Sequence, residues 1–302
     1  MSSTKLEKLA AQLEASDAYR VLRRLVDVPA YNEPDPELRA SGRLRSGVYI
    51  DVETTGLDSS TDQVIELALL PFEFSLDGQI FAVHSGYGGL RDPGIPIPAE
   101  ITQLTGIDDA MVKGQQLDNG KIEAVIEPAH LVVAHNAAFD RPFAEQLHPL
   151  FETKAWACSI NDVPWREEGL GVAKLDYLAC QFGFFYDAHR AGDDCRAGVH
   201  LLSKTLPTSG RLVLAELLDR ARRKTIRIWA LGSPFDSKDK LRERKYRWNG
   251  GEDGRPKSWY RDIDESEFDK ELEYLKSEIF SGHLPDLPTD TINAFNRYSS
   301  RA

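Results

Sequence analysis

An apolar run at residues 47–50 leads directly into two carboxylates, Asp51 and Glu53, which are separated by one residue. β-Branched and aromatic residues in such a run predict a buried strand. Alternate side chains of a strand share a face, so Asp51 and Glu53 are expected to point the same way. Two like charges held this close repel each other unless a cation neutralises them, and Mg²⁺ and Mn²⁺ prefer carboxylate oxygens. The segment therefore predicts half of a metal site.

A second acidic residue of interest, Asp140, follows another predicted strand. That strand, at 130–135, runs into a turn that carries Asp140 close to a helix predicted at 142–150. Aspartate is favoured as a helix N-cap and Pro142 suits the first turn of a helix, so Asp140 has a capping role as an alternative to a ligand role. The two roles are compatible with each other.

His189 and Asp194 open the last helix predicted before the C-terminal region, at about 190–205. Five residues apart on a helix, the two side chains lie only loosely near each other. A helix terminus that faces the strand ends could nevertheless aim both at one point. Taken alone, His189 is typical of an exposed residue in a polar turn, and Asp193 is an alternative ligand to its neighbour Asp194.

The acidic segments resemble, in order and spacing, the three motifs of the DnaQ-like (DEDD) 3′–5′ exonuclease superfamily over about residues 46–205. The matching residues are Asp51, Glu53, Asp140, His189 and Asp194. A histidine five residues before the last aspartate is the pattern of the histidine (DEDDh) branch, and it favours Asp194 over Asp193. Segments 54–57, 101–107 and 135–137 match sequences that flank the motifs in this family.

The resemblance implies an enzyme that hydrolyses phosphodiester bonds from the 3′ end of DNA, single-stranded or frayed, and releases nucleoside 5′-monophosphates in DNA repair, processing or proofreading. Two divalent ions, Mg²⁺ or Mn²⁺, would activate water and stabilise charge on the attacking and leaving oxygens. The implied metal ligands are Asp51, Glu53, Asp140 and Asp194. His189 would accept the proton of the attacking water, a common role for histidine near neutral pH.

Contacts to the terminal nucleotide are also implied by the resemblance. The residues concerned are Thr54, Thr55, Gly56, Leu57, Leu104, Thr105, Asn136 and Phe139. Apolar and aromatic side chains stack on any base, which suits an enzyme that moves stepwise along a strand. Packing in the protein core is an equally good explanation for Leu57, Leu104 and Phe139.

The pattern of elements predicts an α/β fold with a ribonuclease H-like mixed sheet flanked by helices. Three strands, at 47–53, 63–75 and 79–88, are followed by alternating strands and helices. The predicted organisation is an N-terminal helical arm at 1–45, with one or two amphipathic helices in 4–27, an exonuclease domain at 46–206, a connecting helix at 207–224, a small α+β accessory module with an acidic helix at 225–282, and a loose tail at 283–302.

The accessory module is rich in basic and aromatic residues. Between Arg220 and Arg261 there are fourteen lysines and arginines against five acidic residues, although the net charge of the chain is −11. Such a local excess suits phosphate binding, and the module is weakly similar to short basic and aromatic modules of some DNA-processing proteins. The tryptophans at 229, 248 and 259 are expected to form its core. The predicted nucleic-acid surface consists of Arg244, Lys245, Arg247 and Lys257.

Composition bounds the remaining possibilities. No run approaches 18 apolar residues and the N-terminus has no apolar signal core, so neither a membrane helix nor export is expected. Three cysteines without a Cys-x-x-Cys spacing predict reduced thiols and a cytoplasmic protein.

Several alternatives of function and assembly stay open at this level. They are an exoribonuclease that trims RNA 3′ ends, a non-catalytic nucleic-acid-binding module, a subunit that docks on a polymerase or repair complex, and a homodimer. A non-catalytic module would be expected to lack one of the carboxylates, and none is missing.

Overall fold

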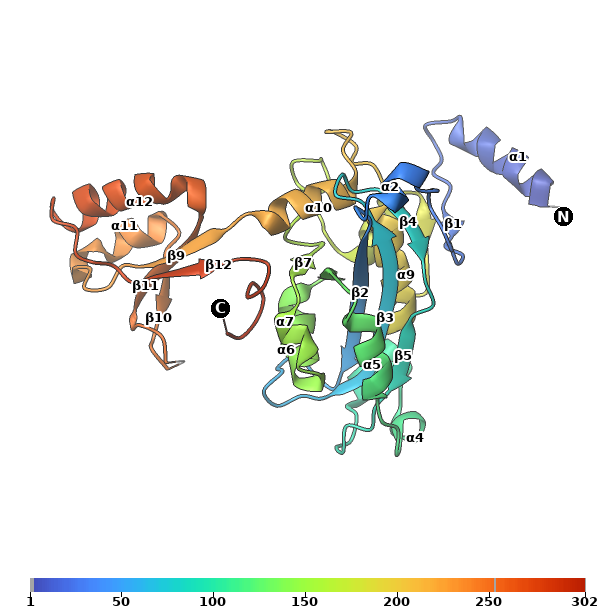
Figure 1. The fold of residues 1–302 in the computed structure, drawn as a ribbon, viewed down its shortest axis with the longest axis horizontal. Helices are drawn as coiled ribbons and strands as arrows, with labels where there is room; N and C mark the ends of the chain where they lie inside the picture. Colours follow the sequence, from blue (N-terminus) through green and yellow to red (C-terminus); the bar gives the residue numbers. More distant parts are fainter. Residues whose placement is uncertain (1–2, 253, 302) are drawn as a thin grey trace. The chain divides into compact units, whose positions relative to one another are not determined.

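The computed structural model describes residues 3–252 and 254–301, which form two compact units, Met1–Arg220 and Ala221–Ala302 (Figure 1). The first unit contains the acidic motifs. The second contains the basic and aromatic segment. Among the described residues, no helix combines the length and the apolar character needed to cross a bilayer. All three cysteines are free thiols, as predicted.

A mixed sheet forms the centre of the first unit, and it confirms the predicted ribonuclease H-like α/β fold. Its strands, in spatial order, are β4 (Ile80–Val83), β3 (Val64–Phe74), β2 (Arg45–Thr54), β6 (Leu131–Ala134) and β7 (Trp156–Cys158), with β5 (Tyr87–Leu90) also paired to β3. Strands β2 and β3 are antiparallel, whereas β2, β6 and β7 are parallel. Parallel neighbours require crossover helices, and these supply the outer layers of the sheet.

The helices of this unit connect and cover the strands (Figure 1). They are α3 (Ala99–Thr105), α4 (Asp109–Val112), α5 (Asn119–Ile126), α6 (Ala137–Leu147), α7 (Leu150–Thr153), α8 (Leu175–Gln181), α9 (Ala191–Leu202) and α10 (Val213–Arg222). Helix α6 is the crossover between β6 and β7. Helix α9 packs on β2 and β3, which brings its first turn to the strands that carry the acidic residues.

The close approach of α9 to β2 depends on Gly198. A Cβ atom at this position would lie 2.0 Å from the Cζ atom of Tyr49, whose ring is fully buried. We expect Gly198→Ala to lower the free energy of unfolding by about 1–3 kcal/mol, the usual cost of overpacking. Gly192→Ala on the same helix is the matched control, since its Cβ would meet only Arg196 at 3.9 Å.

Chemical denaturation of the two variants checks this expectation. Gly192→Ala should be neutral or stabilising by about 0.5–1 kcal/mol, because alanine is a better helix residue than glycine. Equal stability of the two variants would contradict the packing argument.

Two predicted elements of this unit have different boundaries. The strand expected at 79–88 is divided into β4 and β5, which both pair with β3. Pro71 of β3 lies at the break: its carbonyl accepts a hydrogen bond from His84, but proline has no N–H to donate to the same neighbour, so the pairing is interrupted there. The helix expected at 142–150 is α6, which begins at Ala137 and contains Pro142 in its interior. Asp140 therefore lies within the helix, and the N-cap is Asn136.

The N-terminal arm is only partly helical. Helix α1 (Ser3–Glu14) confirms the first predicted helix, and a short helix α2 (Pro36–Ala40) precedes β2. The prediction of helix at 15–27 is wrong: strand β1 (Arg23–Arg24) pairs in parallel with β8 (Phe184–Phe185). Main-chain hydrogen bonds to the segment after α8 replace the helical bonds there.

The second unit is a four-stranded antiparallel sheet with helices on one face. Its strands, in spatial order, are β10 (Arg247–Asn249), β11 (Ser258–Asp264), β9 (Thr225–Trp229) and β12 (Thr289–Ile292). The helical elements are η1 (Phe235–Ser237), α11 (Lys238–Glu243), η2 (Glu265–Glu267) and α12 (Phe268–Tyr274), which continues into a π turn at Leu275–Ile279. Ile228, Leu241 and Ile263 pack with that last turn in one apolar core.

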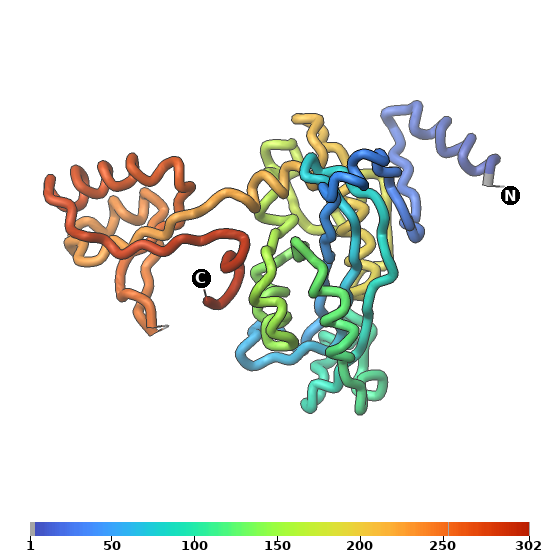
Figure 2. Tube along the Cα trace, in the orientation of Figure 1, coloured from blue at the N-terminus to red at the C-terminus, as the bar shows by residue number. Residues whose placement is uncertain are grey.

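Two expectations for this region are corrected. Residues 283–302, expected to be a loose tail, include β12, which runs beside β9 (Figure 2). Its Asp290 accepts a hydrogen bond of 2.6 Å from the indole N–H of Trp229, a buried donor that needs a partner. Trp229 is 1% exposed and belongs to the interior as expected, whereas Trp248 is 53% exposed and does not.

Candidate active site

Strand β2 presents two carboxylates on one side, because Asp51 and Glu53 alternate with the buried Val52. Asp194, from the first turn of α9, joins them. Carboxylate oxygens of these three residues lie within 4.8 Å of one another. Residues 143 positions apart in the chain therefore meet at the end of β2, as the resemblance implied.

Asp140 reaches the same place from α6. It is 3% exposed, and its Oδ1 accepts a hydrogen bond of 3.3 Å from the main-chain N–H of Val52, the residue between Asp51 and Glu53. The four carboxylates named from the sequence thus surround the end of one strand. We call Asp51, Glu53, Asp140 and Asp194 the carboxylate cluster.

The cluster holds its protons tightly when no cation is present. Burial, followed by the charges of Asp140 and Asp194, raises the pKa of Asp51 well above its usual value. Burial also raises the pKa of Glu53 to about 8 and that of Asp140 to about 8. A divalent cation would reverse these shifts by stabilising the charged forms. The oxygen-only donor set therefore fits a hard dication such as Mg²⁺ or Mn²⁺.

The residues just before α9 are hydrogen-bonded to Asp194 in the first turn of that helix. The main-chain N–H groups of His189 and Arg190 donate to its Oδ2 at 2.8 and 3.1 Å. His189 has a φ of 67°, an uncommon backbone conformation for a residue with a side chain, and its imidazole is exposed. Burial raises the pKa of Asp194, and the hydrogen bonds from Tyr186 and from the His189 main chain oppose that shift. The neighbouring Asp193 instead pairs with Arg196 at 2.5 Å.

Glu66 is a fifth carboxylate at this site, and it is absent from the sequence prediction. It lies directly opposite Glu53 in the β2–β3 ladder. Its oxygens accept hydrogen bonds from the Arg190 guanidinium at 3.0 Å and from the Ala191 N–H at 3.1 Å. Glu66 therefore caps α9 and ties it to the sheet. The available signal in the sequence was an acidic residue within the mostly apolar β3, which contains only Glu66 and Glu73 as charged residues.

Tyr186 is the second residue that the sequence did not indicate. Its hydroxyl donates a hydrogen bond of 2.8 Å to Oδ1 of Asp194. Burial, together with the negative charge of Asp194, raises the pKa of Tyr186 far above its usual value, so the hydroxyl keeps its proton. Tyr186 and the His189 N–H thus bind different oxygens of Asp194 and fix the orientation of its carboxylate.

Leu57 and Leu104, assigned to substrate from the resemblance, are exposed, and packing in the core does not explain them. Leu57 is 86% exposed. Phe139 is partly buried, and its ring lies 5.1 Å from that of Phe143. Asn136 is exposed at the start of α6, with no side-chain hydrogen bond to the helix.

The threonines assigned to substrate are buried, and Thr105 is engaged by its own chain. Its hydroxyl donates to the Ile101 carbonyl. The hydroxyl of Thr55 donates to Asp62, which also accepts from the Asp58 N–H and so closes the loop after β2. Gly56 lies against this carboxylate, since a Cβ atom there would be 2.5 Å from an Asp62 oxygen. Thr54 is likewise bonded within this loop, to the carbonyl of Gly56.

The four basic residues predicted to form a nucleic-acid surface differ in their environments. Arg244 is half-buried and bonded to the buried Glu271, so the structure places it inside the second unit and not on an open surface. Arg247 is exposed but pairs with Asp262 at 3.0 Å. Lys245 and Lys257 are exposed.

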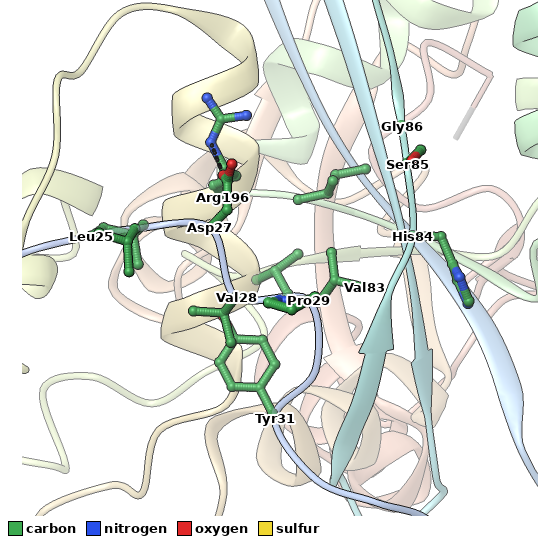
Figure 3. Close-up of a pocket in the computed structure, with 13 residues that line it drawn as sticks. Leu25, Asp27, Val28, Pro29, Tyr31, Val83, His84, Ser85, Gly86 and Arg196 are labelled. Atoms are coloured by element: carbon green, nitrogen blue, oxygen red, sulfur yellow. Dashed lines mark ion pairs between the residues drawn. The ribbon is translucent and has the colours of Figure 1, made fainter.

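A separate cavity of about 290 Å³ lies between the extended segment 25–31, β3, β4 and α9 (Figure 3). Asp27 and Arg196 form an ion pair of 3.4 Å at its edge. Tyr31 bonds to His200 of α9 at 3.0 Å, which holds the segment in place. No residue of the carboxylate cluster lines this cavity, so it is not the site of the predicted chemistry.

Known proteins similar to this chain include polymerases and exonucleases. Over 167 residues the chain is 31% identical to the PolC-type DNA polymerase III of Clostridium perfringens, covering 51% of this chain and 11% of that protein. It is 30% identical over 208 residues to the protein of the same name from Lacticaseibacillus paracasei, covering 63% of this chain and 13% of that protein. The chain thus spans about a tenth of the length of these relatives.

Among solved structures, the chain is similar to exonuclease X in complex with 5′ overhanging duplex DNA, with 26% identity and a TM-score of 0.42 over 58% of this chain and 98% of that chain. Residues 48–202, half of the sequence, match the exonuclease family RNase_T. This span contains all three acidic motifs. The chain therefore belongs to the DnaQ-like 3′–5′ exonuclease family, as the order of its motifs predicted.

Proposed function

We propose that this protein removes nucleoside 5′-monophosphates from the 3′ end of DNA, single-stranded or frayed, in a reaction that depends on two Mg²⁺ or Mn²⁺ ions. The observation that carries the proposal is the convergence of Asp51, Glu53 and Asp194 within 4.8 Å, with Asp140 beside them. The names of the PolC-type relatives support DNA over RNA as substrate, and support a polymerase or repair complex as partner.

The carboxylate cluster would hold the metal ions. Asp51, Glu53 and Asp194 would bind one ion, and Asp140 would join Asp51 at a second. Bound divalent ions supply a lowered pKa for the attacking water and stabilise charge on the phosphate. Tyr186 and the His189 N–H each donate to Asp194 and so hold that ligand in one orientation.

His189 would accept the proton of the attacking water. Its main chain is bonded to Asp194 while its imidazole is exposed, so the ring can reach a substrate that is bound at the cluster. The hydrogen bonds of Glu66 to Arg190 and Ala191 fix the loop that carries the histidine. His189 as the base and Asp194 as a metal ligand would therefore keep a fixed position relative to each other.

Exposed apolar side chains suit the terminal nucleotide. Leu57 follows β2 directly and Leu104 ends α3, and both are exposed. Such side chains pack on a base whatever its identity, which fits stepwise removal along a strand.

Labelled oligonucleotides test the proposal. Single-stranded DNA and RNA, labelled at either end, are incubated with Mg²⁺, Mn²⁺ or EDTA, beside an Asp51→Ala control. We expect a ladder that shortens from the 3′ end of DNA, requires metal and is absent in the variant. Internal cleavage, or activity that survives Asp51→Ala, would refute the proposal, and a preference for RNA would replace DNA as the substrate.

A further inference from the structure

A row of aromatic rings and cations lies on the second unit. Its members are Phe235, Lys238, Arg242, Trp259 and Trp248, and we call them the aromatic stripe. Phe235 is 78% exposed and Trp248 is about half exposed. Large exposed rings that lie beside cations suit a binding surface.

Ring contacts and the spacing of helix α11 connect each member of the stripe to the next. The Lys238 Nζ lies 4.4 Å from the centre of the Phe235 ring. Lys238 and Arg242 are four residues apart on α11, so their side chains are neighbours on one side of the helix. The Arg242 guanidinium lies 5.9 Å from the Trp259 ring.

The last step runs across the sheet. Trp259 of β11 and Trp248 of β10 are directly opposite each other in the antiparallel ladder, so both point to the same face. Their ring centres are 5.6 Å apart and the rings meet edge to face. The stripe therefore runs from a ring on η1, through two cations on α11, to two rings on β11 and β10 of the sheet.

The cations of the stripe are less engaged in ion pairs than four arginines of this unit. Arg244 and Arg261 share the buried Glu271, while Arg227 and Arg247 share Asp262. By contrast, within the described part of the chain Lys238 has no ion pair. Arg242 has only an exposed one of 3.6 Å with Asp239, a type that contributes little.

We propose that the aromatic stripe binds single-stranded nucleic acid, with bases stacked on Phe235 and Trp248 and phosphates bound by Lys238 and Arg242. This inference rests on the proposed function in one respect, since the strand it would bind is the nuclease's substrate. Exposed rings on both sides of two cations offer stacking surfaces for bases and charges for phosphates, and a ring accepts any base. An acidic peptide would satisfy the cations but would leave the exposed rings without flat partners.

The test uses the full chain in EDTA, so that no strand is cut. Anisotropy of a fluorescent single-stranded poly-dT oligonucleotide measures affinity for the wild type and for Phe235→Ala/Trp248→Ala. We expect a loss of about tenfold for each ring removed. Trp248→Phe should restore most of the loss at that position, and Lys238→Ala should lower the dependence of log affinity on log salt by about one unit. Phe295→Ala, an exposed ring of the same unit outside the stripe, should bind as the wild type does.

A small chromogenic diester, thymidine 5′-monophosphate p-nitrophenyl ester, separates this proposal from the proposed function, because it reports on the carboxylate cluster alone. The double variant should hydrolyse it as the wild type does. If that hydrolysis is normal but the double variant binds poly-dT unchanged, the stripe proposal is wrong while the nuclease stands. If the wild type hydrolyses neither the diester nor DNA, the proposed function fails, and the EDTA binding data still decide on the stripe. Binding of acidic peptides, but not of DNA or RNA, through the stripe would also overturn it.

Discussion

Asp51→Asn is expected to lower hydrolysis by at least about 10²–10³-fold, the cost of removing one preorganised electrostatic group, and to raise the thermal stability of the metal-free protein. Activity falls while stability rises because the same negative charges that would bind cations repel one another when no cation is present. Asp51 is surrounded by Asp140, Asp194 and Glu53, whose charges raise its pKa in addition to the effect of burial. Asparagine has nearly the same shape as aspartate, so Asp51→Asn removes one carboxylate from the cluster without changing the packing.

Activity and melting temperature measured on one preparation check this prediction. Asp193→Asn is the matched control: it makes the same chemical change one residue from Asp194, at a carboxylate that pairs with Arg196 outside the cluster. The control should keep most of its activity and should not become more stable without metal. A metal-free Asp51→Asn protein that melts below the wild type would show that the carboxylates do not repel one another.

Strand periodicity and the family resemblance together named the carboxylates that the structure brings together. The two-residue period of a strand placed Asp51 and Glu53 on one side without knowledge of the fold. The five-residue spacing to His189 selected Asp194 over Asp193, and the structure places Asp194 with the other carboxylates. The first inference follows from local strand geometry, whereas the second came from the resemblance to the DEDDh branch.

Residues that act through tertiary contacts were missed for a physical reason. Glu66 reaches α9 only because the β2–β3 register places it opposite Glu53, and register cannot be read from one strand alone. Tyr186 meets Asp194 through a loop without periodicity. The tail and the segment 15–27 were misjudged for the same reason, since both are fixed by pairing with distant strands, β9 and β8.

Stability of the metal-free protein is expected to fall as the pH rises from about 6.5 to about 8.5. Glu53 and Asp140 have folded-state pKa values raised to about 8, against about 4 in an unfolded chain. Between these values the folded state binds more protons than the unfolded state, so the free energy of unfolding decreases with pH. The slope is at most about 1.4 kcal/mol per pH unit for each carboxyl.

Two partly buried histidines limit the pH range in which the slope reports on the carboxyls. Burial lowers the pKa of His135 to about 4 and that of His200 to about 4. An unfolded histidine titrates near about 6.5, so below that pH these residues make stability rise with pH and oppose the carboxyls. Above it they are neutral in both states, and the slope reports the carboxylate cluster.

Calorimetry in EDTA and in saturating Mg²⁺ measures this effect. Mg²⁺ competes with the bound protons, so the increase in melting temperature that it causes should grow from about pH 6.5 to about pH 8.5. Glu53→Gln should remove part of the metal-free slope, because it deletes one of the three carboxyls, with Asp51 and Asp140, whose pKa is strongly raised in the folded state. A metal-free melting temperature that stays constant across this interval would mean that the carboxyls are already ionised in the folded protein. The cluster would then need no cation to offset its charge, and the argument for a metal site from electrostatics would fail.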